Sequence, residues 1–189
     1  MIRGVTFDFW STLYAPDPDR QRGAYPLRVA AYQKLLAAHG LELTLSDAAA
    51  AFDAAEEAFN AAWHDGRPFT ARDRASHLLA ANDLSARDDL LTAAVQELED
   101  AGIHADLRLA PGAAEVIPEL ARQGVRIGLI SDTGTSSGRV LRWFLERDGL
   151  LPYFTALSFS DETGHCKPRV GAFEAALDAL RLPAIEVMH

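Results

Sequence analysis

Three side chains with different chemistry stand where segments typical of β-strands come to an end. Asp8 follows a short β-branched and aromatic stretch, Ser131 follows an apolar run, and Lys167 lies in a loop after a third such segment. The carboxyl ends of parallel strands meet at one edge of a sheet, where α/β proteins bind their ligands. There a carboxylate can attack an electrophile, a hydroxyl can bind the oxygens around it, and an ammonium can neutralise the charge that develops. We therefore predict that these three residues converge on one catalytic site.

The segments that carry these residues alternate between strand and helix patterns. Strand patterns occupy 1–13 (with a tight turn), 125–130, 155–159 and the start of a further strand at 184–189. Helix patterns occupy 112–123 and the segments after Gly134 and after Pro168. Alternation of this kind predicts an α/β fold, a Rossmann-like parallel sheet core flanked by helices.

Residues 15–105 interrupt this alternation with an alanine-rich helical stretch. Four short helices are expected there, from Arg22 to His39, after Ser46, after Thr70 and after Ser85. Thr70 with Asp73, and Ser85 with Asp88, have the spacing of a capping box. We therefore expect an α/β core at 1–14 and 106–189, which lacks its C-terminal part, and a four-helix cap at 15–105. A cap inserted at this point can close over the site as a lid.

Residues around the expected cap are candidates for lining a substrate pocket. Four flank the first strand and are candidates of this kind: Tyr14, Arg20, Arg22 and Arg28. Three aromatic residues share one helix face and are interpreted as the core of the cap: Phe52, Phe59 and Trp63. Arg139, shortly after the second motif, is interpreted as a solvated helix charge.

Composition limits the possible partners and locations. The 189 residues include 27 acidic and 18 basic side chains, for a net charge of -9. This balance argues against nucleic acid or an anionic membrane as a partner, and it makes the binding of an anionic substrate depend on a few well-placed cations. Cys166 is the only cysteine, and no stretch approaches the roughly 20 apolar residues of a membrane-spanning helix. We expect a cytoplasmic protein that binds a small anionic molecule, with a homodimer as one possible state.

The three strand ends, taken in order, resemble the motifs of the haloacid dehalogenase superfamily, in the branch whose helical-bundle cap follows the first motif. That family's first motif is an apolar strand, Asp, any residue, Asp, any residue, and Thr or Val; residues 7–13 read FDFWSTL. The second motif, a strand that ends in Ser or Thr, is similar to residues 128–133, GLISDT. The third, a Lys often followed by Pro, is similar to residues 160–168, SDETGHCKP. The resemblance covers essentially the whole chain.

The resemblance implies a two-step hydrolysis and a role for each matching residue. Asp8 would attack phosphorus or carbon, and water would then cleave the aspartyl intermediate. Ser131, the backbone near Asp132, and Lys167 would bind the substrate. In the phosphatase reaction, Mg²⁺ would be held by the carboxylate of Asp8 and the backbone carbonyl of Trp10, with acidic residues of a fourth motif. A phosphatase acting on a small phosphorylated metabolite is the function that this reading favours.

Trp10 departs from the family's phosphatases, which have Asp at this position to protonate the leaving oxygen and activate water. The 2-haloacid dehalogenases of the superfamily also lack this Asp, with an aromatic residue in its place, and a halide leaves without a proton. A metal-independent dehalogenase that uses Asp8, Ser131 and Lys167 is therefore the alternative. That reading needs no cofactor.

The sequence ends before the Gly-Asp of the family's fourth motif. Residues 184–189, AIEVMH, look like the start of the strand that precedes it. Asp161 and Glu162 lie near Lys167, but we do not expect them to replace the carboxylates of that motif. A second alternative follows, a truncated or catalytically impaired member that acts by binding.

Overall fold

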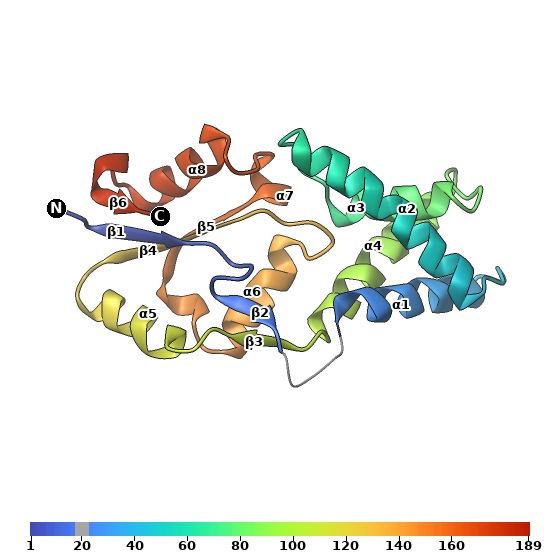
Figure 1. Cartoon of the computed structure of the whole chain (residues 1–189), viewed down its shortest axis with the longest axis horizontal. Coiled ribbons are helices and arrows are strands. Elements are labelled where there is room, and N and C mark those ends of the chain that lie inside the picture. The colour runs from blue at the N-terminus through green and yellow to red at the C-terminus, as the bar shows by residue number, and fades with distance from the viewer. Residues whose placement is uncertain (18–22) are drawn as a thin grey trace.

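A four-stranded parallel sheet forms the centre of the computed structural model, which describes residues 1–17 and 23–189 (Figure 1). Its strands, in the spatial order β5-β4-β1-β6, are Phe154–Phe159, Arg126–Ser131, Gly4–Phe7 and Val187–Met188. β1 pairs in parallel with β4 and with β6, and β4 pairs in parallel with β5. The carboxyl ends of these strands therefore meet at one edge, as the sequence predicts.

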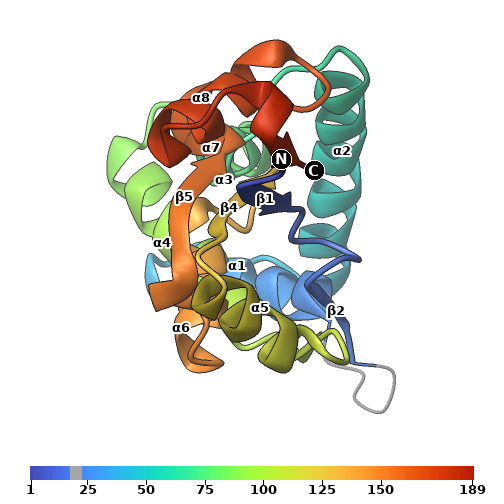
Figure 2. The ribbon, with the colours of Figure 1, turned by 90° about the vertical axis from the view of Figure 1, so that its left-hand side faces the viewer.

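Helices cover both faces of this sheet, as Figure 2 shows with α8 on one side and α5 and α6 on the other. The elements concerned are α5 (Ala113–Arg122), α6 (Gly138–Arg147), the short α7 (Ser160–Thr163) and α8 (Val170–Leu180). Single turns of 3₁₀ helix, Leu151–Tyr153 and Ala184–Glu186, precede β5 and β6. Phe144 of α6 packs in one core with Leu129 of β4, whereas Ile130 faces the opposite way, onto Ala172 and Ala176 of α8. Successive strand residues point to opposite faces, so β4 is buried on both sides. The predicted α/β architecture is confirmed.

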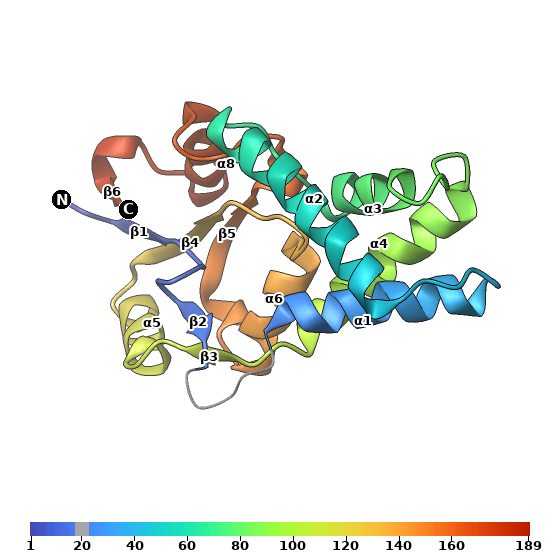
Figure 3. The ribbon, with the colours of Figure 1, turned by 45° about the vertical axis from the view of Figure 1, so that its right-hand side comes forward.

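Four further helices pack together beyond the carboxyl edge of the sheet, on the right of Figure 3. They are α1 (Ala24–Ala38), α2 (Leu45–His64), α3 (Ala71–Ala80) and α4 (Asp88–Ile103). This helical bundle has its own core, in which Tyr32, Phe52, Leu78 and Leu98 are buried together. The four expected helices are thus present, although the expected start at Arg22 lies outside the described residues.

Only one of the helix N-terminal caps predicted from the sequence is present in the structure. Thr70 and Asp73 form the predicted capping box of α3. Helix α2 instead begins two residues earlier than expected, with Thr44 accepting a hydrogen bond from the backbone of Asp47. The predicted box at Ser85 is wrong, because α4 begins at Asp88 after Arg87, which provides no side-chain cap.

A two-stranded antiparallel ribbon joins the sheet to the bundle and was not predicted. β2 (Tyr14–Pro16) leaves toward the helices and β3 (Leu107–Leu109) returns from them, with Tyr14 opposite Leu109. Strands of three residues carry too short an alternation of apolar and polar side chains to be recognised in a sequence. The ribbon thus holds together the two segments that connect the sheet to the bundle, next to the carboxyl end of β1.

Candidate active site

Asp8 and Lys167 form an ion pair at the carboxyl edge of the sheet. Asp8 follows β1 directly, and Lys167 follows β5 by way of α7 and a short loop. The Lys167 ammonium lies 2.7 Å from Asp8 Oδ1, which also accepts a hydrogen bond of 2.8 Å from the backbone of Phe9. Both contacts use the same oxygen, so Oδ2 has no hydrogen-bond partner within the described part of the chain. One carboxylate oxygen is therefore held, and the other is free to meet a substrate.

Lys167 is itself fixed by the end of β4. Its ammonium donates to the carbonyl of Ile130 at 3.2 Å, and its backbone N–H donates to Asp132 Oδ1 at 2.9 Å. These contacts tie the loop after α7 to the strand beside β1. The cation consequently faces Asp8 in a defined direction and does not extend into solvent.

Asp132 adds a second carboxylate to the same place. Burial raises the pKa of Asp132 above its ordinary value, and the negative charge of Asp8 acts in the same direction, while the contact with Lys167 opposes both. The raised pKa means that a negative charge on Asp132 is disfavoured here, chiefly because the group is removed from water and to a lesser extent because of repulsion from Asp8. A cation or a proton brought into the site would relieve that repulsion.

Ser131 ends β4 as the sequence predicts, but its hydroxyl does not open toward a ligand in this structure. The residue is 1% exposed, and its Oγ donates to the backbone carbonyl of Asp132 at 3.2 Å. Of the predicted residues, the structure brings Asp8, Asp132 and Lys167 together around one cavity, while Ser131 lies behind its wall. A rotation about one side-chain bond would be needed for the Ser131 hydroxyl to meet a substrate.

Trp10 forms part of the cavity wall next to Asp8. Its ring packs edge-on against Phe9, with ring centroids 4.8 Å apart. The indole places apolar surface where a second carboxylate would otherwise lie. It has no group that could exchange a proton with a leaving oxygen at neutral pH.

The oxygen donors present fit a magnesium site that water and substrate complete. Those of the described residues are too few for a site made of protein ligands alone. They are the carboxylates of Asp8 and Asp132; Trp10, whose main-chain carbonyl is the other predicted ligand, also borders the cavity. Within the described ranges, no group of three or more His, Cys, Asp or Glu side chains is arranged to hold a metal. Mg²⁺ in phosphoryl-transfer sites is commonly held by one or two carboxylates together with substrate oxygens and water. The donor set suits an ion of that kind.

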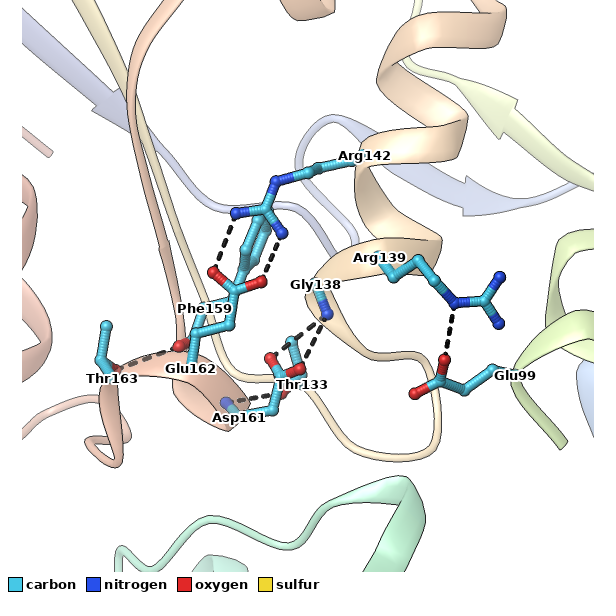
Figure 4. A network of polar contacts seen from close by, with 9 residues as sticks. All are labelled: Glu99, Thr133, Gly138, Arg139, Arg142, Phe159, Asp161, Glu162 and Thr163. Carbon is cyan, nitrogen blue, oxygen red and sulfur yellow. Dashed lines mark hydrogen bonds and ion pairs between the residues drawn. The ribbon is translucent and has the colours of Figure 1, made fainter. Parts of the chain in front are cut away.

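Asp161 and Glu162 are both held by contacts with neighbouring residues (Figure 4). Asp161 accepts hydrogen bonds from the Thr133 hydroxyl at 2.9 Å and from the Gly138 backbone at 3.0 Å. Glu162 pairs with Arg142. Asp161 therefore braces the loop that connects β4 to α6, Glu162 braces α6 itself, and neither carboxylate lines the cavity.

The cavity that contains Asp8 and Lys167 has a volume of about 920 Å³ and lies between the sheet edge and the helical bundle. Its bundle side includes Arg28 of α1, Glu56, Phe59 and Trp63 of α2, and Arg74 of α3. Arg28 thus lines the pocket as predicted, whereas Arg20 and Arg22 lie outside the described residues. Sequence reasoning missed Arg74 and Glu56, because a charge within an amphipathic helix gives no sign of which surface it meets.

Two of the weaker sequence interpretations need correction. Trp63 is 54% exposed and borders the cavity, as does Phe59, so only Phe52 belongs to the core of the bundle. Tyr14 is buried in the sheet core and donates to the carbonyl of Phe144, so it does not line the pocket. Arg139 remains a half-exposed helix charge, as interpreted, and it pairs with Glu99 and Asp100 of α4.

A sequence model of the family described as haloacid dehalogenase-like hydrolase matches residues 2–189. The chain belongs to this family. Its hydrolase class follows from the family, and a comparison with curated protein sequences found no significant relative.

Solved structures of haloacid dehalogenase-like hydrolases share the fold of this chain at low sequence identity. A putative hydrolase, YfnB from Bacillus subtilis, bound to magnesium, has a TM-score of 0.57 at 17% identity, over 98% of this chain and 76% of that one. A protein from Rhodobacter sphaeroides, CbbY, in complex with xylulose-1,5-bisphosphate, has a TM-score of 0.55 at 20% identity, over 99% and 76%. The L-2-haloacid dehalogenase of Xanthobacter autotrophicus has a TM-score of 0.52 at 18% identity, over 99% and 68%. At these identities the likeness establishes the fold. None of the helices in the described part of this family member is long and apolar enough to span a membrane.

Proposed function

We propose that this hydrolase removes a phosphoryl group from a small phosphorylated metabolite through a covalent intermediate on Asp8. The observation that carries the proposal is the 2.7 Å contact between Lys167 and Asp8 Oδ1, on the wall of a cavity large enough for a small molecule. The ion pair and the Phe9 backbone hold Oδ1 in place, while Oδ2 is free to attack phosphorus. The magnesium-bound and sugar-bisphosphate-bound relatives support the same reading.

The reaction has two displacements in this proposal. Asp8 Oδ2 forms a bond to phosphorus as the ester oxygen departs, and water then attacks the aspartyl phosphate, releasing inorganic phosphate and restoring Asp8. Lys167 neutralises charge on the phosphoryl oxygens. Mg²⁺, when bound near Asp8 and Asp132, would offset the repulsion between carboxylate and phosphate. The helical bundle acts as a lid that excludes bulk water from the cavity.

The decisive measurement is hydrolysis of 4-nitrophenyl phosphate with and without Mg²⁺. We expect turnover that EDTA reduces and that Asp8→Asn abolishes, and we expect a phosphoryl adduct on Asp8 in acid-quenched protein by mass spectrometry. Asp178→Asn, an exposed carboxylate on α8, is the matched control and should keep wild-type activity. Folded protein that hydrolyses no phosphate ester and acquires no adduct would exclude the proposal.

Dehalogenation of a 2-haloacid is the second candidate, and the position of Trp10 favours it. The indole stands in the cavity wall beside Asp8, where a phosphatase of this family carries its general acid, and halide departure needs no proton. Attack of Asp8 on carbon would then release halide without a metal. Chloride release from 2-chloropropionate in EDTA, lost in Asp8→Asn, would select this reading. No turnover of either substrate class together with no beryllofluoride adduct on Asp8 would instead select a binding role.

A further inference from the structure

Two arginines are buried in the bundle wall of the cavity, away from the ion pair at the sheet edge. Arg28 of α1 is 9% exposed and Arg74 of α3 is 6% exposed, and both line the cavity that contains Asp8 and Lys167. Guanidinium groups are rarely buried to this degree unless acidic groups compensate them. A negatively charged group that compensates these two cations therefore has to be identified.

The acidic residues nearby do not account for both charges. Arg74 pairs through one nitrogen with Glu56, whose side chain is 50% exposed, at 2.7 Å. Its Nε is buried and has no hydrogen-bond partner among the residues that the structure describes. Arg28 donates only to neutral oxygens, the Leu98 carbonyl at 3.0 Å and the Ser136 hydroxyl at 2.8 Å. One buried cation is thus left without a counter-charge within ion-pair distance in the described ranges.

The surrounding residues hold the two guanidinium groups in place. Aromatic rings flank Arg74, whose guanidinium carbon lies 5.7 Å from the Phe59 ring centre and 5.4 Å from that of Phe69. Arg28 lies against Gly102 of α4, where an added Cβ would come within 2.5 Å of its Nη2. A glycine inside a helix is unfavourable, so the space it leaves for Arg28 has a cost in helix stability. Burial lowers the pKa of Arg28 to about 10, the charge of Arg74 adds to that effect, and Glu99 and Glu56 oppose it.

We propose that Arg28 and Arg74 form a subsite for a second anionic group, so that the substrate is a small phosphate ester that carries a carboxylate or a second phosphate at its far end. The inference rests on the proposed phosphatase function, since it assigns the transferred phosphoryl group to Asp8 and Lys167 and the remote anion to the arginines. Arginine suits this role because its planar fork of donors matches carboxylate and phosphate oxygens. The apolar faces of Phe59 and Trp63 would pack against the part of the substrate between the two charges.

The test compares probes that differ in charge and keep nearly the same leaving group. They are 4-(carboxymethyl)phenyl phosphate, its neutral 4-(carbamoylmethyl)phenyl counterpart, and 1,4-phenylene bisphosphate. We expect wild-type kcat/KM to favour at least one of the two doubly anionic probes over the neutral one by at least about tenfold, which corresponds to 1.4 kcal/mol. Arg74→Met and Arg28→Met should each reduce that ratio to near one. Arg72→Met, an exposed arginine on the same helix, should leave the ratio unchanged.

Binding to Asp8→Asn protein by calorimetry separates this inference from the proposed function. If no probe is hydrolysed but the affinity ratio persists and is lost with Arg74→Met, the subsite stands and the phosphatase assignment falls. If the probes are hydrolysed but wild-type protein shows no preference for charge, the subsite falls and the assignment stands. A preference that survives both arginine variants also overturns the subsite. Arg74→Lys keeps the charge and should retain part of the ratio, which guards against a loss caused by misfolding.

Discussion

Lys167 places one cation between a carboxylate and a main-chain carbonyl, and this position makes its contribution measurable. We expect Lys167→Met to lower kcat/KM for a phosphate ester by about 10²- to 10³-fold, because a donor directed at developing charge contributes this much in other active sites. Lys34→Met, an exposed lysine on α1, is the matched control. A loss below tenfold in folded protein would contradict the role given to this residue.

The effect of Trp10 should be visible in how turnover depends on the acidity of the leaving group. Because the indole cannot protonate a departing oxygen, we expect turnover to fall steeply as the leaving alcohol becomes less acidic, with alkyl phosphates at least about 10²-fold slower than nitrophenyl phosphate. The measurement is kcat across a series of substituted phenyl phosphates. Trp10→Asp should make the dependence shallower. A shallow dependence in the wild type would mean that another group supplies the proton.

The raised pKa of Asp132 leads us to expect that the stability of the folded protein changes with pH. This pKa is raised chiefly by burial, so the folded protein binds this proton more tightly than the unfolded chain does. Its contribution to stability is therefore present at low pH and is lost as pH rises through the raised value. Asp132→Asn should be more stable than wild type at pH 7, with the gain vanishing near about pH 3. Urea unfolding at several pH values tests this, and Asp178→Asn should show no comparable gain.

Helix ends supply the clearest predictions at the scale of single elements. Thr70 closes a complete capping box on α3, so Thr70→Ala should lower the free energy of unfolding by about 1 kcal/mol. Ser85→Ala should change it by less than about 0.5 kcal/mol, because α4 begins beyond this residue. Equal losses in the two variants, measured by urea unfolding, would show that Ser85 caps the helix after all.

Replacing Gly102 in helix α4 by alanine should have the opposite effect on stability to the usual one. Gly→Ala inside a helix generally stabilises a protein by about 1 kcal/mol, but here the new methyl group would collide with the Arg28 guanidinium. We expect Gly102→Ala to destabilise the folded state. In a double-mutant cycle, Arg28→Met should remove the collision and restore the ordinary gain. Additive effects of the two changes would show that they do not interact.

At the scale of the whole molecule, the sequence predicts the features that depend on chain order and misses those that depend on three-dimensional contact. Asp8 and Ser131 could be placed at strand ends because apolar runs stop there, and Thr70 because a capping box is local. The hydroxyl of Ser131 could not be oriented, since its hydrogen bond to the Asp132 carbonyl depends on a side-chain torsion. Arg74 looks like any helix charge until α2 and α3 are packed against the sheet edge. The ion-pair partners of Arg139 could not be predicted for the same reason, because they lie on α4.

The antiparallel ribbon also bears on the order in which the molecule assembles during synthesis. Gly4 of β1 pairs with Arg126 of β4, and the whole helical bundle lies between them in the chain. A nascent β1 must therefore wait, unpaired, until the ribosome has made the entire bundle. The contacts within the bundle are more local, so it can form first. Once β2 and β3 have paired at its base, the two ends of this long detour lie together, and only the turn after β1 and the segment with α5 still separate β1 from β4.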